Sequence, residues 1–305
     1  MNSYSLPAIS IVATPTKRSA ILQLAQEAES RGFAGLACPS LGATLGLCSS
    51  LAHATSTIRF WTSIQPVYYN HPVEMSNTAA HIHEISGGRF GIGLGVSHAP
   101  VVQRLGVTTG KPLSDMSDYV AAMRQNSRFS GELPPVYLAA LRDKMLALSV
   151  DIAEGAIWAN ASLSDISRQV GLVPNERRSD FFMANMIPTV ISDDEEAALA
   201  IHKKTLTGYI SLPNYRNYWR QAGYEDEMNA AEIILETVPK EELAQSLQKV
   251  MSDRWLRDCT ASGSAASVRE QLAEWSDKGV LPIAVMSSTS GGQAKAITEL
   301  FDAYR

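Results

Sequence analysis

The sequence predicts an α/β fold, a closed (β/α)8 barrel that carries a helical insertion. Short apolar runs alternate with longer helical patterns almost from end to end, which is typical of a parallel sheet covered by helices. Eight such runs are found, whereas a doubly wound open sheet more often stops at about five or six strands. The length of 305 residues fits two average domains, but it also fits one barrel.

The eight predicted strands are short apolar runs, each followed by a polar or turn-forming segment. They cover residues 8–13, 35–38, 58–65, 90–95, 135–140, 156–159, 181–187 and 282–286. A helix is expected over residues 19–31, because its apolar residues recur from Ile21 at the spacing of one buried helical stripe. Gly32 follows, as expected of a glycine that ends a helix.

A long region without a clear barrel strand lies between the seventh and eighth predicted strands. It spans about residues 192–279 and contains several helical patterns, with residues 256–260 as the one candidate strand. No low-complexity linker separates this region from the rest of the chain, as would be expected at a domain boundary. We therefore expect one domain, residues 1–305, with a helical insertion at about 192–279.

Composition narrows the class of partner to a small molecule. The formal net charge is -5, which argues against attraction to nucleic acid or anionic membranes. No segment approaches the roughly 18 uninterrupted apolar residues of a membrane span, and the N-terminal apolar run has no basic stretch before it. Cys38, Cys48 and Cys259 show no metal or disulfide spacing, which favours a reducing compartment. We expect a cytoplasmic protein.

Candidate site residues follow from the barrel geometry, because the active site of such a barrel lies at the carboxyl ends of its strands. The residues at these ends are Cys38, Ser40, and residues 63–66, 96–98, 140–144, 158–160 and 286–288. No metal site is expected. His81 and His83 are two residues apart on a predicted helix, so they face different ways and are poor metal ligands.

The fourth predicted strand has an unusual face. Gly91, Gly93 and Gly95 alternate along it, so by the period of two they share one face and leave it without side chains. Either a flat ligand or another backbone must approach that face.

Residues 58–107, IRFWTSIQPVYYNHPVEMSNTAAHIHEISGGRFGIGLGVSHAPVVQRLGV, resemble the bacterial luciferase-like family of flavin-dependent oxidoreductases. In that family a helix ending in an SGGR turn leads into a glycine-rich strand, as it does here. The run PPVYLAALRDKMLALSVDIAEGAI, residues 134–157, and the later run GSAASVREQLAEWSDKGV, residues 263–280, resemble the family too. The resemblance covers most of the predicted barrel but not the helical insertion.

The resemblance implies a cofactor ring at the ends of strands three and four. In the family, a bulge with a non-prolyl cis peptide at the end of strand three supports the ring, and Ser63 and Ile64 occupy the matching positions. The turn and helix start after strand five help bind the cofactor phosphate, since free N–H groups and a positive dipole end suit an anion. With the strand-end rule, the cofactor-binding candidates are Cys38, Ser63, Ile64, Gln65, Gly95, Val96, Ser97, Ala140, Leu141, Arg142, Lys144, Trp158 and Asn160.

The pattern KML followed by IAEG is closer to family members that use the deazaflavin coenzyme F420 than to the FMN monooxygenases. The resemblance therefore implies hydride transfer between F420 and a small organic substrate. One alternative is a two-component monooxygenase that receives reduced FMN from a flavin reductase partner. Another is a non-catalytic relative that binds flavin or has lost the site. If Arg142 and Lys144 do not bind the phosphate, they are two solvated residues at the start of a helix.

The chain also departs from the family pattern. F420-dependent dehydrogenases of the family place a catalytic histidine near the end of strand two, where this chain has CPSLG at residues 38–42. His98 falls where sugar-phosphate dehydrogenase members carry an acidic residue, so it is the candidate catalytic residue, as proton donor or substrate contact. The alternative is a solvated loop histidine. The segment 129–134 is short, so part of the wall over the substrate is expected to be missing.

The family resemblance further implies a homodimer. The helices near residues 43–54 and 75–85 carry more small and apolar residues than a solvated face needs, and we expect them to form the subunit contact.

Overall fold

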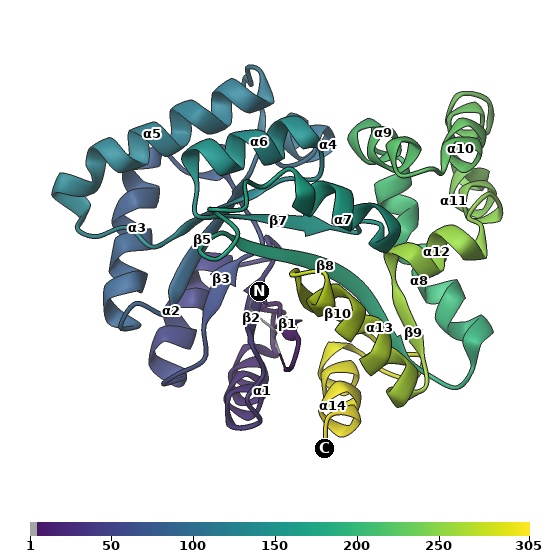
Figure 1. Cartoon of the computed structure of the whole chain (residues 1–305), viewed down its shortest axis with the longest axis horizontal. Coiled ribbons are helices and arrows are strands. Elements are labelled where there is room, and N and C mark those ends of the chain that lie inside the picture. Colours follow the sequence, from purple (N-terminus) through teal and green to yellow (C-terminus); the bar gives the residue numbers. More distant parts are fainter. Residues whose placement is uncertain (1–4) are drawn as a thin grey trace.

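The computed structural model describes residues 5–305 and contains a closed parallel barrel (Figure 1). Its strands are β1 (Ala8–Ser10), β2 (Gly35–Cys38), β3 (Phe60–Thr62), β5 (Phe90–Gly95), β6 (Val136–Ala139), β7 (Gly155–Ala159), β8 (Phe182–Ile191) and β10 (Leu281–Ser287). Because β10 pairs in parallel with both β8 and β1, the sheet closes on itself. The predicted (β/α)8 fold class is confirmed.

All eight predicted strands are present, with some changes in extent. The third is interrupted: β3 ends at Thr62, and after Ser63 and Ile64 the short strand β4 (Gln65–Pro66) resumes pairing with β5. The candidate strand at residues 256–260 was wrong. That segment lies mostly in α12 (Asp253–Cys259), which the Ser252 side chain caps by accepting a hydrogen bond from the Trp255 amide. The strand β9 (Ala261–Gly263) follows and pairs only with β8.

Helices connect the strands around the outside of the barrel. They are α1 (Arg18–Ser30), α2 (Thr44–Ala54), α3 (Pro72–Ile85), α4 (Ala99–Leu105), α5 (Pro112–Ser130), α6 (Asp143–Ile152), α7 (Leu163–Gly171), α13 (Ala265–Asp277) and α14 (Gln293–Ala303), with the short 3-10 helix η1 (Val67–Tyr69) before α3. Gly32 has a φ of 79°, in the left-handed region that a helix-ending glycine adopts. No helix in the described range is both long and apolar enough to cross a membrane.

The segment between β8 and β10 is largely helical. It forms α8 (Glu195–Ile210), α9 (Pro213–Gln221), α10 (Glu225–Thr237), α11 (Lys240–Lys249) and α12, and then β9 and α13. We refer to α8 through α12 as the helical insertion. Figure 1 shows these helices grouped on one side of the barrel strands. Since α13 packs against β8, β9 and β10, it belongs to the layer of helices that surrounds the barrel.

Three aromatic side chains fill the floor of the barrel, toward the amino ends of its strands. The ring of Phe182 lies 5.2 Å from that of Trp61 and 4.4 Å from that of Tyr137. Glycines on neighbouring strands make room for them: a Cβ on Gly35 would lie 2.7 Å from Trp61 Cη2, and one on Gly91 would lie 2.6 Å from Tyr137 Cε2. Side chains from alternate strands thus fill one layer, as in other barrels of this class.

Candidate active site

The carboxyl ends of the strands form an open mouth. Inward-pointing side chains deep in the barrel, such as Ala37 and Ala184, are fully buried. Nearer the carboxyl ends of the strands, the inward-pointing side chains are only half-buried. These residues are Ala139, Ala159, Met186, Val285 and Ser287. Most of them are small, so the barrel is closed at its floor and accessible at its carboxyl end, where barrel enzymes bind their ligands.

The bulge between β3 and β4 lies at this mouth. The Ser63–Ile64 peptide bond is cis, which confirms the expectation from the family resemblance. Ser63 Oγ donates a hydrogen bond of 3.1 Å to Met186 Sδ on β8. The Ile64 side chain lies over Gly95, where a Cβ would be only 2.7 Å from Ile64 Cδ1. The bulge and the end of β5 therefore form one continuous surface.

The glycine face of β5 meets another backbone, which was one of the two expectations. Thr62 Oγ1 donates to the Gly93 carbonyl at 2.7 Å and accepts from the Gly93 amide at 2.9 Å. A Cβ on Gly93 would overlap the Thr62 carbonyl oxygen and lie 3.1 Å from its carbon. Gly91 packs against Tyr137, and Gly95 against Ile64. The protein itself fills this face, so no flat ligand is needed to explain the glycines.

Four of the predicted site residues point their side chains away from the mouth. Cys38, Ala140 and Trp158 are 0% exposed and belong to the core between barrel and helices. Gln65 is also buried, and its Nε2 donates to Asn70 Oδ1 at 3.3 Å. Each is adjacent in sequence to a residue that faces the barrel interior, so strand alternation turns it outward. Any contact of these four residues with a ligand at the mouth would therefore involve their backbone atoms.

The turn after β6 presents the start of α6. Arg142 is the N-cap residue of α6 and makes no side-chain capping hydrogen bond. Arg142 and Lys144 are exposed, while Leu141 is half-buried and its carbonyl accepts a hydrogen bond from Gln169 Nε2 at 3.0 Å. The uncapped first-turn amides and two exposed cations are features that suit an anion.

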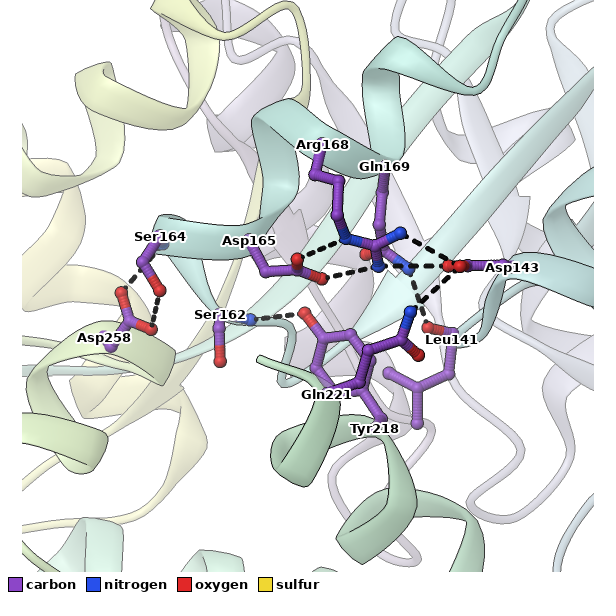
Figure 2. A network of polar contacts seen from close by, with 10 residues as sticks. All are labelled: Leu141, Asp143, Ser162, Ser164, Asp165, Arg168, Gln169, Tyr218, Gln221 and Asp258. Carbon is purple, nitrogen blue, oxygen red and sulfur yellow. Dashed lines mark hydrogen bonds and ion pairs between the residues drawn. The ribbon is translucent and has the colours of Figure 1, made fainter. Parts of the chain in front are cut away.

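Figure 2 shows a polar network that joins α9 to the ends of β6 and β7. Arg168 on α7 pairs with Asp143 at the start of α6 at 2.9 Å, and Gln221 on α9 donates to the same carboxylate at 2.9 Å. Tyr218 Oη, also on α9, accepts from the Ser162 amide at 2.9 Å. The hydrogen bond from Arg168 is the main reason why the pKa of Asp143 lies below its usual range. The carboxylate is therefore ionised and already paired.

Asn160, at the end of β7, has a buried side chain. It is 3% exposed, and its φ of 56° lies in the left-handed region, which asparagine tolerates better than most residues. Its carbonyl accepts from Trp219 Nε1 on α9 at 3.1 Å, and its Nδ2 makes no well-formed hydrogen bond, with the Tyr209 phenol as its polar neighbour. Asn160 therefore links the end of β7 to the helical insertion through both its backbone and its side chain.

His98 follows β5 and is the N-cap residue of α4. With Val96 and Ser97 it is half-buried, and Ser97 has a φ of 62°. The His98 ring lies 5.8 Å from the ring of Tyr215 and 6.3 Å from that of Tyr209, both from the helical insertion. Burial lowers the pKa of His98, so its ring is mostly neutral at pH 7. His98 is therefore a packed residue at the mouth and not a solvated loop histidine.

Tyr209 and Tyr215, which lie beside His98, were not among the site residues predicted from the sequence. The one signal for them was the aromatic-rich stretch YISLPNYRNYW, residues 209–219, within the region where the family resemblance fails. A cavity of about 590 Å³ also lies between α8 and the loop after β10, and Lys204, Ser287 and Ser288 are among its lining residues. The helical insertion thus borders the barrel mouth near both β5 and β10.

Comparisons with known proteins place these features in a family. The profile of the luciferase-like monooxygenases matches residues 6–281, which run from before β1 to the start of β10. The chain is 23% identical over 273 residues to 5,10-methylenetetrahydromethanopterin reductase from Archaeoglobus fulgidus, an alignment that covers 81% of this chain and 82% of that protein.

Solved structures share the fold. The coenzyme F420-dependent tetrahydromethanopterin reductase from Methanopyrus kandleri superposes with a TM-score of 0.78 at 17% identity, covering 100% of both chains. The oxygenating constituent of 3,6-diketocamphane monooxygenase from Pseudomonas putida, solved with FMN, gives a TM-score of 0.61 at 14% identity and covers 97% of both. At these identities the structures inform the fold alone. The family profile extends over nearly the whole barrel, and on that ground the chain belongs to the luciferase-like monooxygenase family.

Proposed function

We propose that the protein is a coenzyme F420-dependent oxidoreductase that transfers a hydride between this cofactor and a small organic substrate. The observation that carries the proposal is the bulge at Ser63–Ile64, packed on Gly95, in the position where the family supports the cofactor ring. The pattern KML followed by IAEG, within residues 144–155, is closer to family members that use F420 and supports the choice of cofactor. The small inward-pointing residues at the mouth leave room for a bound cofactor.

In this proposal F420 supplies the hydride chemistry. The protein positions the cofactor and the substrate relative to each other and excludes water from the site. Ser63, Ile64 and Gly95 form the platform for the ring, and Val96, Ser97 and Asn160 lie around it. Leu141, Arg142 and Lys144 offer backbone amides and positive charge to the cofactor phosphate at the start of α6. Cys38, Gln65, Ala140 and Trp158 support these residues from behind, because their side chains lie in the core.

Cofactor titration tests the proposal directly. We expect the fluorescence of F420 to be quenched when it binds to the protein. Its Kd should be at least about tenfold lower than the Kd for FMN. The absorbance and mass of any small molecule that copurifies provide an independent check. Tight FMN binding with oxygen uptake after addition of FMNH2 would instead support the alternative, a two-component monooxygenase with a flavin reductase partner. Binding of F420 without turnover of any substrate would indicate a non-catalytic relative.

His98 is the proposed catalytic residue. A neutral imidazole beside the ring site can accept a proton when substrate is oxidised and return it in the reverse direction. His98→Gln should lower kcat by about a hundredfold and leave the Kd for F420 nearly unchanged. Steady-state kinetics together with fluorescence titration separate the two effects. An unchanged kcat would show that His98 only packs at the mouth, and a large loss of F420 affinity with normal kcat would assign it to cofactor binding.

We also propose a homodimer. The apolar residues of α2, such as Leu47 and Leu51, are already buried within the subunit. The apolar residues beside α2 and α3 that remain exposed are Leu41 at 63%, Tyr69 at 42% and Val73 at 44%. Light scattering at micromolar concentration should give the dimer mass, and Val73→Asp should shift it toward the monomer. A monomeric wild-type protein would contradict the proposal.

The proposed setting is the cytoplasm. All three cysteines are free and buried, as expected in a reducing compartment. Burial raises the pKa of Cys259 well above its usual range, so its thiol is protonated and unreactive.

A further inference from the structure

The short helix α4, which follows β5 at the barrel mouth, is loosely packed. None of its residues, Ala99–Leu105, is buried. Every residue from Gln103 to Ser114 is exposed, so the chain runs along the surface until α5 docks. Among the described residues, the hydrogen bonds of the segment 99–109 stay within residues 98–106. Because a helix this short is only marginally stable in water on its own, little holds α4 in one position.

The backbone on both sides of α4 permits a change of direction. Ser97 has a φ of 62° and Gly106, which ends the helix, has a φ of 67°. A Cβ on Gly106 would meet no atom within 4 Å. Residues 107–109 are exposed, and then the Gly110 amide donates to Asp115 Oδ2 at 2.8 Å. Since three extended residues reach about 10 Å, the end of α4 can move while Gly110 stays in place.

The apolar face of α4 is covered at one end only. Val101 and Val102 lie four and three residues before Leu105, so the three side chains share one face of the helix. The two valines are half-buried, whereas Leu105 is 42% exposed. Just before the helix, the His98 ring packs on Tyr215 of α9, and Figure 1 shows α4 next to α9. The first turn of α4 is therefore docked at the mouth, and its last turn carries an uncovered leucine.

We propose that α4 is a lid for the barrel mouth, which turns about Ser97 and Gly106 and places Leu105 over the bound cofactor and substrate. A bound ligand offers the apolar surface that Leu105 lacks in the open form, so ligand binding favours closure. Closure also excludes water from the reacting atoms, as lids over enzyme sites commonly do. This inference rests on the proposed function, because the lid closes on ligands of the same mouth.

Hydrogen–deuterium exchange followed by mass spectrometry tests the lid in the whole protein. In the cofactor-free protein, the amides of residues 99–107 should exchange nearly as fast as those of an unstructured peptide. With saturating F420 their exchange should slow by at least about tenfold, because closure buries them. The helix α11 is also mostly exposed, but it packs on α8 and α10, and its exchange should not change.

The possible outcomes separate the lid from the cofactor. Binding of F420 without added protection of residues 99–107 would overturn the lid and leave the cofactor proposal standing. Protection by FMN but not by F420 would support the lid and overturn the choice of F420. Strong protection in the cofactor-free protein would show that α4 is already held in place, by its own chain or by a second subunit, and would overturn the lid. Binding of neither cofactor would overturn both proposals.

The Leu105→Gln variant tests the closing contact. Glutamine suits a helix as well as leucine does, but its amide would be buried without a partner under the closed lid. The variant should raise the Kd of F420 by at least about fivefold and lose most of the added protection of residues 99–107. Its melting temperature should stay unchanged, because Leu105 is exposed in the open form. Ile233→Gln is the matched control, since Ile233 on α10 is 62% exposed, and it should behave as wild type. Equal Kd and equal protection in Leu105→Gln and wild type would overturn the proposal.

Discussion

Replacement of Gly93 by alanine is expected to destabilise the fold by more than about 4 kcal/mol, a value reached only when a mutation disrupts backbone or core packing. The added Cβ would overlap the carbonyl oxygen of Thr62, and neither backbone can move without separating β3 from β5. The two hydrogen bonds between Thr62 Oγ1 and Gly93 would be lost at the same time. Denaturation by urea or guanidinium measures the effect.

Gly171→Ala is the matched control for this experiment. Gly171 ends α7, and a Cβ there would meet no atom within 4 Å. At such a position, alanine is expected to leave stability unchanged or to raise it by about 0.4–1 kcal/mol through the entropy of the unfolded chain. A Gly93→Ala protein as stable as wild type would show that β3 and β5 can separate freely, and that the strand needs no glycine there.

The barrel was predictable because strand periodicity and strand count are local properties of the sequence. The alternation of Gly91, Gly93 and Gly95 indicated a close approach on one face, and the structure shows that Thr62 makes the approach. The bulge at Ser63–Ile64 was predictable from the family resemblance alone, since composition and spacing contain no sign of it. Local pattern therefore predicted the elements, and the resemblance predicted the bulge between two of them.

The direction of individual side chains was harder to predict. Cys38 and Trp158 lie at strand ends, but strand alternation turns both into the core between barrel and helices. A stricter use of the period of two would have selected their inward-pointing neighbours, Ala37 and Ala159. The strand-end rule selects one edge of the sheet, but it does not say which face of a strand each residue occupies.

The contact between His98 and the helical insertion could not be predicted at all. Tyr209 and Tyr215 meet His98 from helices more than a hundred positions further along the chain, in the region that resembles the family least. No local periodicity specifies such a pairing, because it depends on how α8 and α9 dock on the ends of β6 and β7. The hydrogen bonds of Gln221 to Asp143 and of Trp219 to Asn160 hold that docking in place.

The stability of the protein is expected to fall by about 3 kcal/mol between pH 6.5 and pH 4 because of His202, given about 1.4 kcal/mol per pKa unit. His202 lies on α8, which packs against β8 and β9, and its side chain is 0% exposed. Burial lowers its pKa from 6.5 to about 4, an effect that the backbone of Ala261 only partly offsets. Neither ring nitrogen makes a well-formed hydrogen bond, so the Ala261 backbone compensates a proton on the buried ring only in small part.

The pH dependence follows from the order of protonation. As the pH falls below 6.5, His202 in the unfolded chain takes up a proton that the folded protein binds only near pH 4, so the unfolded state is favoured over this interval. His202→Leu removes the titration, and its free energy of unfolding should therefore lose about 3 kcal/mol less than that of wild type between pH 7 and pH 4. His81→Gln, on the exposed side of α3, leaves His202 in place and should keep the full wild-type slope. Equal slopes in His202→Leu and wild type, measured by chemical denaturation across this pH range, would show that the folded protein protonates His202 as readily as the unfolded chain does.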